Sequence, residues 1–507
     1  MSDLKKIKTA LISVYYKDGL EDILQEMKHL GIEIFSTGGT KSFIEGQGIP
    51  VKSVEELTSY PSILGGRVKT LHPKVFGGIL ARREDNQDLK ELEKFEIPEI
   101  DLVIVDLYPF EETVKSGATP QGIIEKIDIG GISLIRAAAK NFKDVTVIST
   151  KDQYPKLLDI LKNKKAETTI GQRKNFAGES FKISSSYDIA IYDFFAGDEP
   201  NFYKTSHGPI HKLRYGENPH QSGYFYGDFS HLFEQLHGKE ISYNNLLDIE
   251  AAVQLISEFH ETTFAILKHN NACGAASRPK LVDAWNAALA ADPVSAFGGI
   301  LICNKTVDKD TAEEANKIFF EVIIAPAYEP DALEILKSKK NRIILIQKHF
   351  DLPLVQYRSL LNGLLVQDRD THTEQKEYMQ LVTTKQPTES QFTDLVFANI
   401  LVKHSKSNAI VLVKGKQLLA SGVGQTSRVD ALKHSIEKAK GFGFDLKEAV
   451  MASDAFFPFA DSVEIAGKEG INAVIQPGGS VKDKDSIDYC NQNNIAMVFT
   501  GIRHFKH

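Results

Sequence analysis

Residues 9–37, "TALISVYYKDGLEDILQEMKHLGIEIFST", hold two apolar runs on either side of a helical pattern. The runs at 9–16 and 32–37 predict buried strands. Between them Gly31 is suited to end a helix whose apolar residues recur at helical spacing: Leu20, Ile23, Leu24, Met27 and Leu30. Two strands joined by a helical crossover pair in parallel, so this segment predicts an α/β layer fold.

The alternation continues along the chain and is interrupted once. Residues 196–212 lose all periodicity and gather Pro, Gly, Asp and His, which indicates a linker. A chain of 507 residues also exceeds the roughly 250–300 that one core supports. We therefore expect domains at 1–199 and 200–507, the second with two subdomains. Further strands are predicted at 102–110, 145–150, 264–269, 298–304, 341–347, 449–455, 472–479 and 495–501, and a hairpin at 409–422 that turns at Lys414 and Gly415.

The composition is that of a globular protein, with 42% apolar and 25% charged residues. No apolar run approaches the ~20 residues of a membrane helix, and the first residues do not match a signal peptide. The three cysteines are widely spaced without a CxxC pattern, which predicts reduced thiols in a cytoplasm. A net charge of −7 argues against nucleic acid as a partner. These features predict a cytoplasmic enzyme with no membrane or nucleic-acid partner.

Two glycine-containing segments of the first domain suit an anion. "STGGTKSF" (36–43) follows a strand and opens a helix, where free N–H groups attract phosphate and Thr40 is suited to cap. A strand, two glycines and a helix also form a common plain connector, which is the alternative. "LGGRVKTLHPKVFGGIL" (64–80) sets four basic residues between two glycine pairs, a pattern that suits a sugar phosphate: Arg67, Lys69, His72 and Lys74. A solvated charge cluster is the plainer alternative. Neither a Walker A nor a GxGxxG pattern is present.

Two more segments add polar groups. "LYPF" (107–110) sets Tyr108 at the carboxyl end of a strand, where α/β sheets bind ligands. "KIDIGGISLIRAAAKN" (126–141) supplies Asp128, followed by Arg136 and Lys140 on one helix face, which could also be a solvated face.

The second domain contains "FAILKHNNACGAA" (264–276), in which Lys268 and His269 follow an apolar strand. Neighbouring side chains of a strand point to opposite faces, so the pair is suited to one ligand only where the strand ends. A solvated strand end is the alternative.

The motifs resemble those of the bifunctional AICAR transformylase/IMP cyclohydrolase family, in its bacterial form. "GGRVKTLHP", "DLYPF" and "IDIGG…RAAAKN" are similar to the cyclohydrolase domain, and "RYGENPHQ", "KHNNACG", "DPVSAFGG", "KHSKSNAIVL", "GVGQTSRVD", "SDAFFPFAD", "QPGGSVKD" and "FTGIRHFKH" to the transformylase. The resemblance implies a methylglyoxal-synthase-like parallel-sheet domain followed by two cytidine-deaminase-like subdomains.

It also implies the chemistry. A formyl group passes from the co-substrate 10-formyltetrahydrofolate to AICAR, giving FAICAR, which then closes its ring with loss of water to IMP. These are steps of purine biosynthesis. No tightly bound cofactor and no metal are expected, and family members are homodimers.

For formyl transfer, His269 would be the general base, because an imidazole accepts a proton near pH 7. The ammonium of Lys268 would keep it neutral by charge repulsion and steady the oxyanion, and Asn408 would add a polar contact. By resemblance, the substrate contacts are Arg214, Tyr215, Phe297, Gly298, Glu321, Arg428, Phe456, Asp461, Ser480 and Arg503.

For ring closure, the resemblance gives proton transfer to Lys140, with Lys69, Tyr108 and Asp128 around the reacting groups. Phosphate and ribose would be held by Lys17, Thr37, Gly38, Gly39, Thr40, Arg67 and Thr70. The chain departs from the family pattern at Tyr15, Phe76 and Ala272, among others.

Two other functions are alternatives. A zinc-dependent deaminase needs HxE or CxE followed by PCxxC, which neither "HNNACGAA" nor "HETTF" (260–264) supplies. A first domain that only senses an effector would not require Lys69, Tyr108, Asp128 and Lys140 together.

Overall fold

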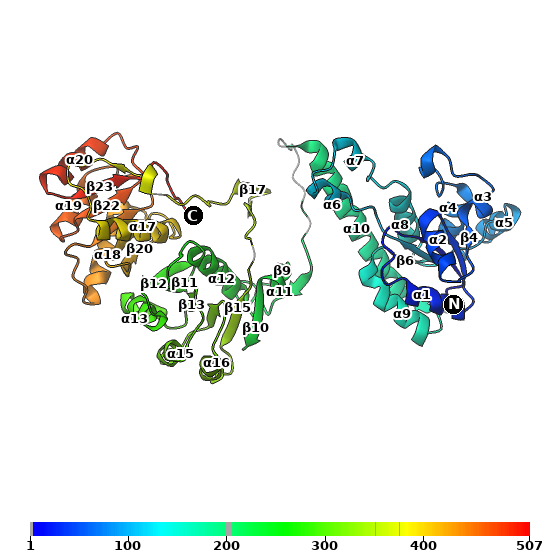
Figure 1. Ribbon diagram of the computed structural model, residues 1–507, viewed down its shortest axis with the longest axis horizontal. Helices are drawn as coiled ribbons and strands as arrows, with labels where there is room; N and C mark the ends of the chain where they lie inside the picture. Colours follow the sequence, from blue (N-terminus) through cyan, green and yellow to red (C-terminus); the bar gives the residue numbers. More distant parts are fainter. Residues whose placement is uncertain (1–3, 198–204, 206, 350, 375) are drawn as a thin grey trace. The chain divides into compact units, whose positions relative to one another are not determined.

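The computed structural model describes residues 4–197, 205, 207–349, 351–374 and 376–507. The chain forms two compact units, residues 1–206 and 207–507 (Figure 1). The domain boundary expected at 199/200 lies outside the described residues. In the expected linker, α10 ends at Ala196 and β8 begins at Ile210.

The first unit is built on a parallel five-stranded sheet in the order β4-β3-β2-β5-β6. Its strands are β2 (Thr9–Ser13), β3 (Glu33–Ser36), β4 (Lys52–Ser53), β5 (Leu102–Val105) and β6 (Thr146–Ile148). All four β5 residues are buried, as a strand covered on both faces requires. The parallel α/β fold is as predicted, and α1 (Glu21–His29) buries Ile23, Leu24 and Met27.

The other elements of this unit cover or extend the sheet. They are α2 (Gly38–Gly46), α3 (Val54–Thr58), η1 (Leu64–Gly66), α4 (Pro73–Leu80), α5 (Asn86–Lys94), α6 (Phe110–Lys115), α7 (Pro120–Ile124), α8 (Gly130–Lys140), η2 (Lys151–Gln153), α9 (Tyr154–Asn163), α10 (Ile170–Ala196) and the ribbon of β1 (Leu4–Lys6) with β7 (Glu167–Thr169).

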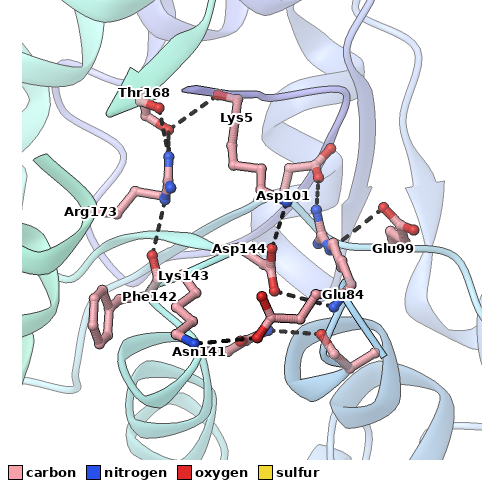
Figure 2. Close-up of polar contacts among 12 residues, drawn as sticks. Lys5, Glu84, Glu99, Asp101, Asn141, Phe142, Lys143, Asp144, Thr168 and Arg173 are labelled. Carbon is pink, nitrogen blue, oxygen red and sulfur yellow. Dashed lines mark hydrogen bonds and ion pairs between the residues drawn. The ribbon is translucent and has the colours of Figure 1, made fainter. Parts of the chain in front are cut away.

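A polar network closes the amino-terminal edge of this sheet (Figure 2). The Asp101 carboxylate precedes β5 and pairs with Arg83. It also accepts the N–H groups of Lys8 (2.7 Å) and Thr9 (2.9 Å) at the start of β2. Asp144 precedes β6 and pairs with Lys5 at 2.8 Å. These charged side chains therefore have structural partners at this edge of the sheet.

The second unit contains two six-stranded sheets with the same topology. The first has the order β10-β15-β14-β13-β11-β12 and the second β18-β23-β22-β21-β19-β20. In each, three parallel strands are flanked by an antiparallel hairpin on one side and an antiparallel edge strand on the other. This duplication agrees with the two subdomains of one fold that the family resemblance implies, although the sequence itself shows no short repeat.

The first sheet consists of β10 (Phe233–His237), β11 (Thr263–Lys268), β12 (Asn271–Ser277), β13 (Ile300–Cys303), β14 (Val322–Ala325) and β15 (Ile343–Gln347). The second consists of β18 (Gln380–Leu381), β19 (Ile410–Val413), β20 (Leu418–Gly422), β21 (Val450–Ser453), β22 (Ala473–Gln476) and β23 (Ala496–Phe499). Every strand predicted for this unit is confirmed, as is the hairpin at Lys414–Gly415.

One apolar core joins the two sheets. Leu267 of β11 and Val411 of β19 belong to it, together with residues of α12 (Tyr243–Ile256) and α17 (Glu389–Lys403). The remaining elements are β8 (Ile210–Lys212), β9 (Tyr224–Tyr226), α11 (Phe229–Leu232), α13 (Leu281–Ala291), α14 (Pro293–Ala296), α15 (Lys309–Ala315), α16 (Pro330–Lys337), β16 (Val355–Leu360), β17 (Gly363–Asp368), η3 (Lys376–Tyr378), α18 (Arg428–Gly441), α19 (Asp461–Lys468) and α20 (Asp483–Gln492).

Cys273, Cys303 and Cys490 are buried and unpaired. Across the described residues, the structure contains no helix that is both long and apolar enough to span a membrane.

Candidate active sites

The carboxyl edge of the five-stranded sheet gathers residues from several loops. Because β2, β3 and β5 are parallel, the segments that follow Ser13, Ser36 and Val105 lie at one edge. Thr40 joins two of these segments: its Oγ1 donates to the Val14 carbonyl (2.9 Å) and accepts from the Val14 N–H (3.1 Å). Thr40 therefore does not cap α2, contrary to the prediction.

The basic segment 64–72 contacts this edge from another direction. Lys69 lies against Gly38, since a β-carbon built on Gly38 would stand 3.1 Å from Lys69 Nζ. Thr70 lies against the start of α8, where a β-carbon on Gly130 would stand 2.9 Å from its Oγ1. Arg67 pairs with Glu125 at 2.5 Å. The structure thus brings Lys69 and Thr70 to the Gly38–Thr40 turn and to α8.

Asp128 is buried directly before α8. Its Oδ1 accepts the Ile132 N–H (3.1 Å), while the Tyr187 hydroxyl accepts the Asp128 N–H (2.9 Å) and donates to the Lys126 carbonyl (2.7 Å). Burial raises the pKa of Asp128, and backbone hydrogen bonds offset this only in part. Burial and the nearby Asp128 charge raise the pKa of Tyr108, so its phenol stays protonated at neutral pH.

Lys17 lies in the loop after β2, where its Nζ donates to the carbonyls of Val14 (2.5 Å) and Tyr15 (2.9 Å). Burial lowers the pKa of Lys17, and the Asp106 carboxylate opposes that effect. Lys126 lies over the rings of Tyr15 (5.2 Å) and Tyr108 (5.6 Å).

Asp106 was missed by the sequence analysis although it lies within the quoted "DLYPF". Its carboxylate accepts the N–H groups of Tyr15 and Tyr16, the latter at 2.9 Å, and so fixes the loop that carries Lys17. Its position at the end of β5, ahead of Tyr108, was the available signal.

Lys140 is not brought to the other predicted residues within this unit. It is the last residue of α8, whereas Asp128 precedes the first turn, and an 11-residue helix is about 16 Å long. The Lys140 and Arg136 side chains are both exposed.

In the second unit, Lys268 and His269 form part of a tight hairpin rather than an open strand end. Lys268 of β11 pairs with Asn271 of β12, and the two turn residues, His269 and Asn270, have φ of 51° and 64°. Positive φ at both central residues is the pattern of a type I′ turn. The Asn270 N–H donates to Asp248 Oδ1 at 2.7 Å, which anchors the turn from α12.

The hairpin contacts two neighbouring segments. Lys268 Nζ donates to the carbonyl of Phe297 (2.9 Å). The Asn271 side chain donates to the His269 carbonyl (2.8 Å) and accepts a hydrogen bond from the Lys406 N–H (3.0 Å). Lys406 lies two residues before Asn408. Asn271 therefore links the histidine turn to the segment that carries Asn408.

The first sheet places Lys268, Gly298 and Glu321 at one edge. β11 runs antiparallel to β13, so Lys268 at the end of β11 lies at the same edge as Gly298 and Glu321, which precede β13 and β14. Phe297 is exposed and packs against Phe319, and Glu321 pairs with Lys239 at 2.5 Å. Arg214 and Tyr215 lie between β8 and β9, with the guanidinium 5.6 Å from the phenol ring.

In the second sheet, the predicted residues lie at the carboxyl edge of the parallel strands. Asn408 precedes β19, and Phe456, Asp461, Ser480 and Arg503 follow strands β21 to β23. Buried Arg428 donates to Asn408 Oδ1 (2.9 Å) and to Ser453 Oγ (3.0 Å), and it pairs with the buried Asp454. Asp454 also accepts from Ser407 Oγ at 2.6 Å. Phe456 is partly exposed whereas Phe457 is core.

Asp454, Asp248 and Asn271 support the predicted residues but were not themselves predicted. Among the described residues, no three or more His, Cys, Asp or Glu side chains are grouped so that they could hold a metal ion.

Comparison with known proteins gives two family matches. A model described as AICARFT/IMPCHase bienzyme matches residues 138–438, and one for the MGS-like domain matches 19–133. The chain is 64% identical to the bifunctional purine biosynthesis protein PurH of Bacteroides thetaiotaomicron, over 100% of both chains. It is 48% identical to PurH of Aquifex aeolicus (98% of this chain, 100% of the relative) and 46% identical to that of Caldicellulosiruptor saccharolyticus (99% and 100%). The predicted methylglyoxal-synthase-like first domain is confirmed.

Proposed function

Because this chain belongs to the AICARFT/IMPCHase bienzyme family, we propose that each of its two units carries one of the family's two reactions. The chain is a bifunctional formyltransferase and cyclohydrolase that catalyses the last two steps of IMP synthesis, as predicted. AICAR is formylated to FAICAR, and FAICAR is then cyclised to IMP. The comparisons do not support the zinc-dependent deaminase.

Formyl transfer is assigned to the second unit, and the observation that carries this assignment is the β11–β12 hairpin. The 5-amino group of AICAR attacks the formyl carbon of 10-formyltetrahydrofolate and must lose a proton. His269 accepts that proton as general base. The ammonium of Lys268 has three N–H donors, and one of them donates to the Phe297 carbonyl. A second N–H can therefore donate to the oxyanion. The tetrahedral intermediate then collapses and releases tetrahydrofolate.

Binding of the two substrates is assigned to the edges around the hairpin. Asn408, held by Arg428 and linked to the hairpin through Asn271, contacts the reacting group. Partly exposed Phe456 offers an aromatic face for the pterin. The other proposed contacts are Arg214, Tyr215, Phe297, Gly298, Glu321, Asp461, Ser480 and Arg503.

Ring closure is assigned to the carboxyl edge of the first unit. The carboxamide nitrogen attacks the formyl carbon, and water leaves after proton transfer to the former carbonyl oxygen. Lys69 and the protonated phenol of Tyr108 are suited to stabilise the oxyanion, and Asp128 to accept or donate a proton. Lys140 remains the proposed proton carrier by family resemblance. The phosphate and ribose contacts proposed are Lys17, Thr37, Gly38, Gly39, Thr40, Arg67 and Thr70.

The proposed function also includes the co-substrate, the cellular location and the oligomeric state. The family uses formyltetrahydrofolate as co-substrate, and we propose that no cofactor stays tightly bound. Three buried, unpaired cysteines support a cytoplasmic location. A homodimer is supported by the resemblance and by the β16–β17 ribbon, which exposes several apolar side chains, among them Leu360, Leu364 and Leu365.

The test is incubation of the protein with AICAR and 10-formyltetrahydrofolate while tetrahydrofolate and IMP are followed separately. Release of tetrahydrofolate followed by IMP supports both assignments. His269→Ala should stop the first product, and IMP should still form from added FAICAR. Loss of both reactions in this folded variant would contradict the assignment of separate sites.

A further inference from the structure

A buried histidine in the C-terminal tail has no role in the reaction steps above. His504 is 2% exposed, and both ring nitrogens face carboxylates. Nδ1 lies 2.6 Å from Asp370 Oδ2, and Nε2 lies 2.5 Å from Glu374 Oε1. An imidazole donates through both nitrogens only when it is protonated. His504 is therefore an imidazolium held between two carboxylates.

The charged groups around His504 agree with this state. Burial alone would lower its pKa, but the bonds to Asp370 and Glu374 outweigh burial and raise the pKa to about 9. Glu374 also accepts from Asn399 of α17 at 2.8 Å. Asp370 is half-exposed, and the charges of His504 and Lys403 help to lower its pKa against the opposing effect of burial.

The same tail is fastened to the segments that carry Asn408 and Arg428. The His504 N–H donates to the carbonyl of Asp454, which pairs with Arg428. Lys506, two residues after His504, is bonded to Ser407. The Ser407 N–H donates to the Lys506 carbonyl (2.9 Å), and the Lys506 N–H donates to Ser407 Oγ (3.1 Å). The tail thus crosses directly beside the proposed formyl-transfer site.

Side chains along the tail alternate in exposure. His504 is buried, whereas Arg503 and Phe505 on either side of it are exposed, with the Arg503 guanidinium 4.4 Å from the Phe505 ring. Inward anchoring of His504 therefore turns Arg503 outward. A chain terminus with few apolar side chains frays unless it is tied down, and two charge-assisted hydrogen bonds supply that tie.

We propose that His504 is a positioning residue for formyl transfer: clasped by Asp370 and Glu374, it holds the tail so that Arg503 faces the nucleotide beside Asn408 and Arg428. This inference rests on the proposed function, in which Arg503 contacts AICAR. His504 itself touches no reacting atom.

The experiment measures kcat and KM for AICAR at saturating 10-formyltetrahydrofolate, from pH 6.5 to 10, in full-length protein. His504→Gln is expected to raise KM about tenfold, the size of one lost charge-assisted contact, and to change kcat much less. Adding it to Arg503→Ala should not raise KM further. His507→Gln, an exposed histidine of the same tail, is the matched control and should leave both constants unchanged.

The pH profile separates positioning from general damage. In the unaltered protein, KM should rise as the pH passes about 9, where His504 loses its proton. Glu374→Gln keeps the histidine but removes one carboxylate, so the rise should move to lower pH. In His504→Gln this transition should be absent. If His504→Gln fails to fold by circular dichroism, Glu374→Gln decides the question alone.

Two results would overturn the inference. The first leaves the proposed function intact, and the second also contradicts the proposed role of Arg503. If Arg503→Ala raises KM but folded His504→Gln and Glu374→Gln match the unaltered protein, His504 does not position the tail and the proposed site stands. If Arg503→Ala leaves KM unchanged, the placement of Arg503 in the proposed function fails and the inference fails with it.

Discussion

Lys69 reaches across from the basic segment 64–72 and lies against Gly38, at the first residue of α2. A β-carbon on Gly38 would stand only 3.1 Å from Lys69 Nζ, and Gly38 has a φ of 46° that side chains rarely adopt. The backbone conformation thus favours glycine, and an added side chain would also push Lys69 Nζ away by a few tenths of an ångström.

Gly38→Ala is therefore expected to displace Lys69 and to strain the turn by about 1–2 kcal/mol. Cyclisation of FAICAR should fall by tenfold or more, whereas formyl transfer by the other unit should be unchanged. Gly46→Ala at the end of the same helix is the control, because no atom lies within 4 Å of its added carbon. Equal cyclohydrolase activity in both variants would contradict a close Lys69–Gly38 approach in the working site.

A change in the β11–β12 hairpin is expected to have the opposite effect on the two reactions. His269→Ala should reduce formyl transfer by roughly 10²–10⁴-fold, the usual effect of removing a general base, while FAICAR cyclisation stays intact. His260→Ala, an exposed histidine ahead of β11, should leave both reactions unchanged. Similar damage to both reactions in the His269 variant would indicate misfolding or a shared site.

Lys140→Ala should do the reverse, with cyclisation lost and formyl transfer kept. Because α8 separates Lys140 from Asp128, Lys69→Ala should be measured beside it. If Lys140→Ala retains full cyclisation and Lys69→Ala does not, Lys140 is not the proton carrier, and Lys69 keeps its proposed role at the oxyanion.

Much of the fold could be predicted because the strands of both units are apolar runs with strong strand propensity. The "LVIV" of β5 is an example, and its burial follows from the sequence. β12, "NACGAAS", could not be predicted in this way because Ala and Gly have low strand propensity. It forms through packing, since a side chain on Gly274 would collide with the Ala288 carbonyl of α13.

The site residues show the same division. The residue patterns drew attention to Lys69 and His269, and the family resemblance added Asn408, whereas Asp454 and His504 were not predicted. Their roles depend on contacts with Arg428, Asp370 and Glu374, which the spacing along the chain does not reveal. Lys140 lies at the opposite end of α8 from Asp128, and its role in ring closure stays a prediction.

A fragment ending at residue 206 should fold and convert FAICAR to IMP without folate. The core clusters of the first unit draw only on residues before Phe195, and the Lys69, Tyr108 and Asp128 groups precede the boundary. The measurement is IMP formation by the purified fragment beside the full chain. A folded but inactive fragment would contradict the placement of ring closure in this unit.

The stability of the second unit should depend on pH through His504. A folded-state pKa of about 9, raised from 6.5, stabilises the fold fully below pH 6.5, and this contribution is lost as the pH rises through 9. The loss should be less than about 3 kcal/mol, because Asp370 is half-exposed and solvent screens its charge. Denaturant unfolding of the unit at pH 6.5 and 9.5 measures it, with His504→Gln as comparison. An equal fall in the variant would assign the effect to other groups.

Hybrid dimers test the assembly, which rests mainly on the family resemblance. If each formyl-transfer site combines the hairpin of one protomer with the Arg428 edge of its partner, mixing His269→Ala with Arg428→Ala chains leaves one intact site in each hybrid. Partial recovery of formyl transfer is then expected after the chains are dissociated and reassociated together. Mixing His269→Ala with Lys268→Ala should give no recovery, because both changes lie on the same hairpin. Within one chain the hairpin also contacts the Asn408 segment through Asn271, so a site built from a single protomer would show no recovery in either mixture. That result, with dimers demonstrated by sedimentation, would contradict a shared site, and a fully active monomer would contradict the dimer itself.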